Sequence, residues 1–142
     1  MKKTNSFSVV KKQHGICLSR EGKSIVQFAE GDYLLEEQFE LPDGSALIWI
    51  VDGGGYDDGL HIYLIGKDSR VCDAIEGGIT FVPAILKIKN FGNNWVDFEF
   101  FNNGKSYRLE VANKPKFRLC LPLGWRYKKL FAKHRLKIRE IN

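Results

Sequence analysis

Apolar and polar residues alternate in short stretches along most of the chain, and turn-forming residues separate one stretch from the next. A period of two places every second side chain on the same face of a β-strand. The dipeptide Glu21-Gly22, for example, separates Gly15–Ser19 from Ser24–Phe28, which predicts a short hairpin. Because this pattern recurs from one end of the chain to the other, it indicates a β-rich fold.

A second hairpin is predicted around Pro42-Asp43-Gly44, with strands over Tyr33–Leu41 and Ser45–Val51. Asp-Gly suits both a two-residue loop and a three-residue bulged loop, and the two loops give different registers. Within the second strand, Ala46–Val51 is apolar on both faces. Such a run is typical of a central strand that is covered on each side.

The clearest hairpin joins Trp95–Phe101 to Ser106–Val111 through Asn103-Gly104. A type I′ turn needs a positive φ at both central residues, and Asn-Gly tolerates this best. The resulting register puts three apolar pairs on one face and pairs Glu99 with Arg108 on the other. We therefore predict a well-specified two-stranded unit here.

Two segments favour helix instead. Ser69–Glu76 is predicted as a short helix, with Ser69 as its N-cap and Gly77 as its stop. Near the C-terminus, apolar residues recur at spacings of three and four, which predicts a basic amphipathic helix. The residues of this stripe are Tyr127, Leu130, Phe131, His134, Ile138 and Ile141. A competing interpretation ends that helix near His134 and forms a last strand over Leu136–Ile141.

The fold predicted from these patterns is mainly β, or β-rich α+β. It is a curved antiparallel sheet, a sandwich or an open barrel built from hairpins, with one short helix and the C-terminal helix. The chain has 142 residues, of which 44% are hydrophobic and 13% aromatic. These values favour a globular protein, and we expect residues 1–142 to form a single domain.

Charge is distributed unevenly along the chain. The net charge is +5, but residues 1–113 hold 12 Lys and Arg against 16 Asp and Glu, a net charge of −4. Residues 114–142 hold 10 Lys and Arg against one Glu, a net charge of +9. The chain is thus an acidic body followed by a basic C-terminal segment of the same domain, and this asymmetry bears on its partners.

Cysteine usage and hydropathy bear on the compartment. Cys17, Cys72 and Cys120 are scattered and show no CxxC spacing, which favours a reducing cytoplasm with small buried thiols, although one disulfide stays open. The N-terminus lacks the apolar stretch of a signal peptide. No apolar run approaches the roughly 20 residues of a membrane span, so we expect a cytoplasmic protein without one.

The stretch VDGGGYDDGL, residues 51–60, does not fit a phosphate-binding loop, whereas calcium binding by Asp52, Asp57 and Asp58 stays an open alternative. It lacks the Lys and hydroxyl of a Walker loop, the third glycine of a dinucleotide fingerprint and the alternating acids of an EF-hand. We interpret it as a hairpin loop that also serves as an acidic contact surface for a basic protein partner. Its candidate residues are Asp52, Tyr56, Asp57 and Asp58.

The basic segment is the second candidate site. Cations interleaved with aromatic rings suit phosphates and stacked bases, or an acidic protein partner. The candidate residues are Trp125, Arg126, Lys128, Lys129 and Arg135. The alternative is that the aromatic side chains fill the core and the lysines cover its solvated face.

Catalysis has little support in the sequence. His14, His61 and His134 lie in unrelated segments without a catalytic or metal-binding motif, so no cofactor and no metal is expected. An enzyme, most simply a hydrolase, would bring His61 or His134 within hydrogen-bond reach of a carboxylate in a cleft. The predicted hairpin also opposes Asp97 to Glu110, which we interpret as solvated surface.

The sequence therefore predicts a binding protein. A compact binder with polarised charge suits a bacterial immunity protein, which neutralises a basic toxin domain by charge-complementary occlusion. One alternative is a nucleic-acid-binding domain that uses the basic segment. Another is a small-ligand-binding β-barrel with a cavity lined by Trp49, Phe98 and Phe100.

Overall fold

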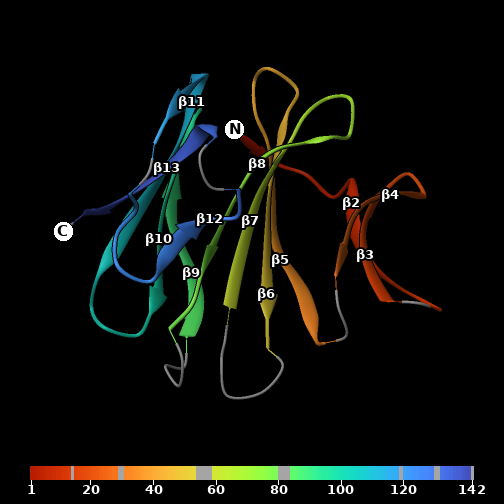
Figure 1. The fold of residues 1–142 in the computed structure, drawn as a ribbon, viewed down its shortest axis with the longest axis horizontal. Coiled ribbons are helices and arrows are strands. Elements are labelled where there is room, and N and C mark those ends of the chain that lie inside the picture. Colours follow the sequence, from red (N-terminus) through yellow and green to blue (C-terminus); the bar gives the residue numbers. More distant parts are fainter. Residues whose placement is uncertain are drawn as a thin grey trace.

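A computed structural model describes residues 1–13, 15–28, 31–53, 59–79, 84–118, 120–129 and 132–141. Within these ranges, every regular element is a β-strand, and the strands form three antiparallel sheets. The three sheets lie in layers (Figure 1). The predicted mainly β class is confirmed, and the three antiparallel sheets do not close into a barrel.

The middle layer is a six-stranded sheet that supplies one wall of both cores. Its strands, in spatial order, are β1 (Lys2–Lys3), β5 (Tyr33–Glu40), β6 (Ala46–Asp52), β7 (Gly59–Ile65), β8 (Val71–Gly77) and β12 (Trp125–Tyr127). Strand β12 comes from the basic segment and pairs with β8, so it closes one lateral edge of this sheet.

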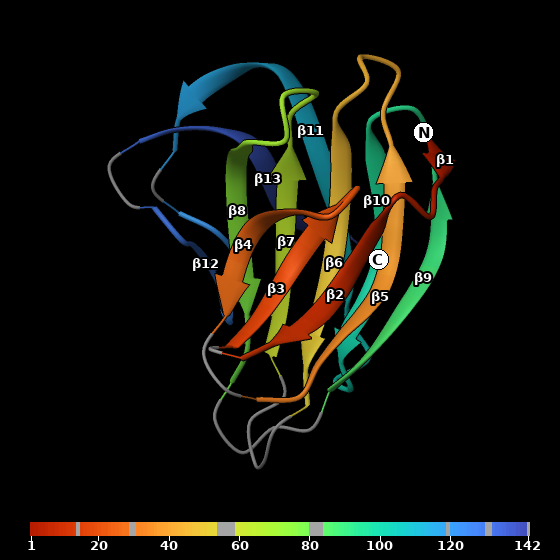
Figure 2. The ribbon, with the colours of Figure 1, turned by 90° about the vertical axis from the view of Figure 1, so that its right-hand side faces the viewer.

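The two outer layers cover opposite faces of the middle sheet. On one face lies a four-stranded sheet in the order β13 (Lys133–Ile141), β11 (Ser106–Phe117), β10 (Trp95–Phe101) and β9 (Ala84–Phe91). On the other face lies a three-stranded sheet in the order β2 (Phe7–Lys12), β3 (Gly15–Arg20) and β4 (Lys23–Phe28). The smaller sheet crosses the middle one obliquely, and β12 lies beyond the edge of β4 (Figure 2).

The larger core lies between the six-stranded and four-stranded sheets. The rings of Trp49 and Phe98 meet edge to face with centroids 4.9 Å apart, and Trp125 packs 5.5 Å from Phe98. Trp49 and Phe98 are fully buried, and Phe100 is 1% exposed. The three rings expected to line a ligand cavity thus belong to a cluster of packed aromatic side chains.

The smaller core lies between the six-stranded and three-stranded sheets. Strand β6 sends Ile48 and Ile50 into it, while Leu47 and Trp49 point into the larger core. This double burial confirms the prediction that Ala46–Val51 is a central strand covered on both faces.

The predicted hairpins are present, with one change of register. Strands β3 and β4 meet at Glu21 and Gly22, and β5 and β6 flank residues 41–45. In the Asn-Gly hairpin, Asp97 opposes Arg108, whereas Glu99 was expected there. Only Gly104 has a positive φ (76°) in that loop, so the turn is not type I′. The loop is longer and shifts the pairing by two residues, which leaves the apolar face unchanged.

The predicted helix over Ser69–Glu76 is wrong, because these residues form a turn and strand β8. Ser69 has a φ of 64°, whereas an N-cap residue has an extended backbone. From Val71 onward the chain pairs with β7, and Ile62 opposes Ile75. Burial of Ile75 between two sheets outweighs the helix propensity of a segment this short.

The predicted C-terminal helix is also wrong, since residues 133–141 form strand β13. His134, Leu136 and Ile138 are buried and alternate with exposed or half-buried residues, as in a strand with one buried face. A spacing of four residues fits both helix and strand, and pairing with β11 decides between them. The last strand of the competing interpretation, over Leu136–Ile141, is confirmed with an earlier start at Lys133, but its helix ending near His134 is absent from the described residues.

Candidate functional site

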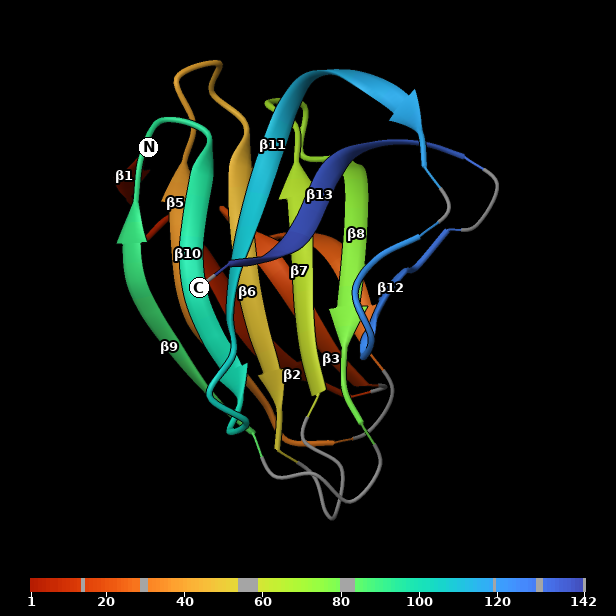
Figure 3. The same cartoon turned by 90° about the vertical axis from the view of Figure 1, so that its left-hand side faces the viewer.

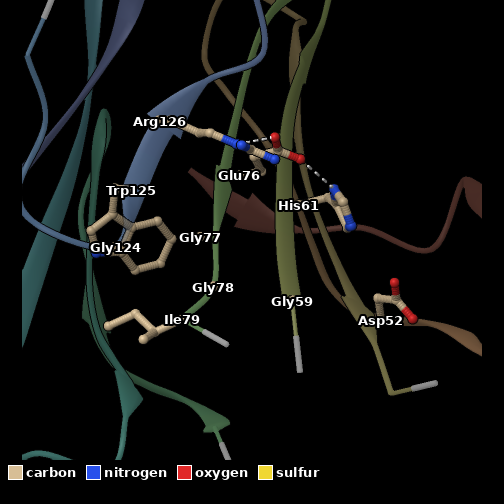
Figure 4. Close-up of a pocket in the computed structure, with 10 residues that line it drawn as sticks. All are labelled: Asp52, Gly59, His61, Glu76, Gly77, Gly78, Ile79, Gly124, Trp125 and Arg126. Atoms are coloured by element: carbon tan, nitrogen blue, oxygen red, sulfur yellow. Dashed lines mark hydrogen bonds and ion pairs between the residues drawn. The ribbon is translucent and has the colours of Figure 1, made fainter. Parts of the chain in front are cut away.

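A cleft of about 480 Å³ opens at the lateral edge of the six-stranded sheet, where β7, β8 and β12 lie side by side (Figure 4). Three cross-strand partners form one row of its wall: His61 opposes Glu76, and Glu76 opposes Arg126. The cleft is lined by Asp52, Gly59, His61, Glu76, Gly77, Gly78, Ile79, Gly124, Trp125 and Arg126. Both predicted candidate sites contribute to it, through Asp52 from one and Trp125 and Arg126 from the other.

The carboxylate of Glu76 is the central charge of the cleft. Its Oε1 accepts a hydrogen bond from Nε of Arg126, and its Oε2 lies 3.4 Å from Nζ of Lys128. Burial by itself raises the pKa of Glu76, but the two cations outweigh burial and hold the pKa below its usual value. Glu76 is therefore ionised at neutral pH and bound by two cations.

His61 stands on the other side of Glu76 and is neutral at physiological pH. Its Nδ1 lies 3.7 Å from Oε2 of Glu76, which is longer than a hydrogen bond. Burial lowers the pKa of His61 to about 4, and the ammonium of Lys128 adds to this effect. The rings of Phe28 and Tyr33 lie within 6.2 Å of the imidazole and keep water from part of it.

Trp125 forms a wall of the cleft through its contact with Gly77, its cross-strand partner on β8. A Cβ atom at position 77 would lie 2.2 Å from the indole ring, so only glycine lets the ring lie against the strand. The side chain is 6% exposed and packs against Phe98, Phe101 and other core rings. Trp125 is thus a core residue and offers no free face to a stacked base.

The other predicted residues of the basic segment have different partners. Lys128 binds Glu76 from outside the cleft, and its ammonium lies 5.2 Å from the ring centroid of Tyr63. Arg135 donates to the carbonyl of Ala112 at 2.8 Å and lies 3.3 Å from a carboxylate oxygen of Asp43. Lys129 is exposed and makes no ion pair within the described residues. Arg126 and Lys128 thus share the carboxylate of Glu76, and Lys128 and Lys129 line one groove, whereas Arg135 binds Asp43.

The acidic loop joins two strands that line the cleft. Asp52 ends β6, and Gly59, which opposes it in the sheet, begins β7. Tyr56, Asp57 and Asp58 lie outside the described residues. Strand β12 of the basic segment lies at the cleft, whereas the end of β11 and the start of β13 lie far from the end of β6 (Figure 3).

His134 also meets a carboxylate, but in a place without access to solvent. Its Nδ1 lies 2.8 Å from Oδ1 of Asp73, and the residue is 1% exposed. Oδ2 of Asp73 accepts hydrogen bonds from the backbone N–H groups of Arg135 and Leu136, both at 2.9 Å. This carboxylate therefore fastens β13 to β8.

The predicted opposition of Asp97 and Glu110 is wrong, because the register differs by two residues. Both carboxylates bind arginine instead: Asp97 accepts two hydrogen bonds from Arg108 at 2.6 and 2.8 Å. Glu110 accepts one from Nε of Arg139 at 2.8 Å. Each carboxylate has its own cation, so the two form no acid–base pair.

All three cysteines are free, but only Cys17 is buried, whereas Cys72 and Cys120 are exposed, contrary to the prediction of buried thiols. Across the described ranges, no group of three His, Cys, Asp or Glu side chains is placed to hold a metal ion. The same residues include no helix with the length and hydropathy needed to cross a membrane.

Sequence reasoning missed Glu76 and Gly77, the residues around which the cleft is organised. Both lie in the segment predicted as a helix and its stop, and their partners are 50 and 48 positions further along the chain. No local pattern in VCDAIEG, residues 71–77, signals this long-range pairing.

The fold and the cleft together define an all-β protein of three stacked antiparallel sheets with a mixed-charge cleft at one edge. Comparison of the chain with protein-family models, curated proteins and solved structures finds no match.

Proposed function

We propose that this chain is a cytoplasmic binding protein of bacteria that neutralises a toxin by occluding it, in the manner of an immunity protein. The contact surface in this proposal is the end of the molecule that carries the cleft and the acidic loop. The observation that carries it is that Asp52, His61, Glu76 and Arg126 line one open cleft from which the loop departs.

The charges at this end suit a basic partner. Asp52 and Glu76 line the cleft, and Asp57 and Asp58 belong to the segment that joins its two strands. Arg126 and Lys128 bind the carboxylate of Glu76. A cleft of about 480 Å³ is large enough to take one projecting cationic side chain.

Part of the basic segment lies away from this contact surface, whereas Arg126 and Lys128 of the same segment lie at the cleft, where Glu76 binds both. A basic surface beside the acidic loop would repel a basic partner, but the end of β11 and the start of β13 lie at the other end of the molecule (Figure 3). Charge-complementary contacts of this kind accelerate association and confer specificity.

The state of the two described histidines favours binding over catalysis. His134 is 1% exposed and its carboxylate partner holds backbone N–H groups. His61 lies beyond hydrogen-bond distance of Glu76, which two cations already bind. Neither pair presents an available general base to a substrate.

The test is capture of a partner from source cells at moderate salt, followed by reconstitution from purified components. We expect a one-to-one complex with a protein whose enzymatic activity is inhibited at saturation. Asp57→Lys combined with Asp58→Lys should weaken binding by roughly 10-fold or more. The matched control is Glu36→Lys with Glu140→Lys, which reverses two exposed charges elsewhere.

Two results would contradict the proposal. One is a partner whose activity is unchanged when the chain is bound at saturation. The other is recovery of nucleic acid that salt releases and that depends on Lys128 and Lys129, which would move the function to the basic segment.

A further inference from the structure

A second groove, of about 520 Å³, lies between the edge of the three-stranded sheet and the uncovered edge of the six-stranded sheet. One wall is strand β4, through Ile25 and Val26. The floor includes Tyr63 and Ala74 from the middle sheet. The far wall is basic and includes Lys128, Lys129 and Lys133.

Strand β4 presents an unpaired edge to this groove. It pairs with β3 on one side only, and within the described chain no backbone group of residues 23–28 bonds to any other element. In an antiparallel pair, alternate residues direct their N–H and C=O groups away from the partner strand. These groups are the template to which a further strand adds.

The far wall carries uncompensated positive charge. Lys129 and Lys133 are exposed and make no ion pair with any described residue. Lys128 is already held by Glu76. The carboxylate that lines this groove, Asp73, is buried and accepts four hydrogen bonds from inside the protein.

We infer that this groove binds an extended acidic segment of a partner protein, which adds to β4 as a fourth strand. Side chains of a strand alternate between two faces. One face would meet the floor at Tyr63 and Ala74, and acidic residues would approach Lys129 and Lys133. This site is separate from the cleft of the proposed function. It binds an acidic segment, whereas the proposed partner of the cleft is basic.

A peptide is favoured over nucleic acid by the chemistry of the groove. A single-stranded nucleic acid binds through cations and exposed rings, and it does not pair with the backbone donors and acceptors of a strand edge. Tyr63, the ring on the floor, is 4% exposed and is covered by the ammonium of Lys128. An extended peptide uses all three features of the groove: the strand edge, the apolar floor and the lysines.

The probe is a fluorescein-labelled heptapeptide, Asp-Val-Glu-Val-Asp-Val-Glu, titrated with the intact protein and followed by fluorescence anisotropy. We expect the affinity of this acidic peptide to be at least roughly 10-fold higher than that of the peptide Lys-Val-Lys-Val-Lys-Val-Lys. Lys129→Glu with Lys133→Glu should weaken binding by roughly 10-fold or more. The matched control is Lys11→Glu with Lys12→Glu, which changes the same charge on the exposed strand β2.

Two N-methylated forms of the acidic peptide test strand addition directly. One form is methylated on the odd amides and the other on the even amides, so that each blocks one edge of the peptide. We expect only one of them to lose binding, because a strand pairs through one edge at a time. Equal binding of both forms and the parent peptide would overturn the inference. So would a short oligothymidylate that binds more tightly than the peptide and loses affinity in the lysine variant.

Discussion

The imidazole Nδ1 of His134 lies 2.8 Å from Oδ1 of Asp73, and both side chains are almost completely buried. The contact joins β13 to β8 across 61 positions of the sequence. Because the carboxylate accepts, Nδ1 of the imidazole donates the hydrogen bond. The ring of His134 also stacks on Tyr127 of β12, with centroids 3.6 Å apart, so the pair anchors two segments of the basic region.

Replacing Asp73 by Asn should strongly destabilise the protein. Asn has only one acceptor oxygen. If its NH2 group takes the place of Oδ2, the backbone N–H groups of Arg135 and Leu136 lose their acceptor and stay buried without partners. We expect the free energy of unfolding to fall by about 3–5 kcal/mol, as for other broken buried pairs. Urea unfolding followed by tryptophan fluorescence measures the change.

The matched control for this substitution is Glu110→Gln, which removes one charge from an exposed pair. Glu110 and Arg139 are 36% and 46% exposed, and such pairs contribute about 0–1 kcal/mol. Equal losses of stability in the two variants would show that Asp73 has no special structural role.

His61 should make the stability of the protein depend on pH. Its pKa is about 4 in the folded protein, against 6.5 for an unperturbed histidine. Between these values the unfolded chain binds a proton that the folded chain does not, so stability falls as the pH falls from 6.5 to 4. The full effect is about 3 kcal/mol, and it is absent above that window.

The variant His61→Phe tests this dependence. The aromatic side chain can occupy the same space among Phe28, Tyr33 and Tyr63 but cannot be protonated. We expect its stability to decline less than that of the unmodified protein between pH 6.5 and 4.5, as measured by urea unfolding at each pH. Parallel curves for the two proteins would show that His61 is not the responsible group.

The parts of the fold that sequence reasoning predicted correctly depend on neighbouring residues. Glu21 and Gly22 both have a positive φ, as a tight hairpin turn needs, and the turn brings together strands adjacent in sequence. The apolar run Ala46–Val51 likewise contains the information that both of its faces are buried. Local chemistry is sufficient in both cases.

The parts that sequence reasoning predicted incorrectly depend on distant partners. His134 and Ile138 are four positions apart, a spacing that suits one face of a helix or of a strand. Strand β11 selects the strand by pairing with β13, and Glu76 enters the cleft because Arg126 lies opposite it. Neither partner is visible in the local pattern, so the cleft could be predicted only in part, from Asp52, Trp125 and Arg126.

Arg20 should be important for the attachment of the three-stranded sheet. Its guanidinium donates to Oγ of Ser69 at 2.8 Å and to the carbonyl of Gly66 at 3.3 Å, and it lies over the ring of Phe7. Lysine cannot make this forked set of contacts. We expect Arg20→Lys to cost about 1–2 kcal/mol.

Hydrogen exchange locates the effect of that substitution. Protection of the amides in β2–β4 should fall more than protection in β10 and β11, because Arg20 links the smaller sheet to the turn between β7 and β8. Arg70→Lys is the control, since the side chain of Arg70 is 86% exposed and its ion pair is 3.8 Å long. Loss of protection equally throughout the molecule would contradict a local role.

Gly77 should not tolerate even one additional carbon atom. A Cβ at this position would lie 2.2 Å from the indole of Trp125, and that ring is itself held by Phe98 and Phe101 in the larger core. The indole would have to move or the strands β8 and β12 would have to separate. We expect Gly77→Ala to lower the free energy of unfolding by about 1–3 kcal/mol, as overpacking does, and to change the tryptophan emission.

Gly53→Ala is the matched control, because a Cβ at position 53 meets no atom within 4 Å. The stability of this variant should stay within about 0.5 kcal/mol of that of the unmodified protein. If the two variants behaved alike, the close contact between Gly77 and Trp125 would not determine how β12 closes the edge of the sheet.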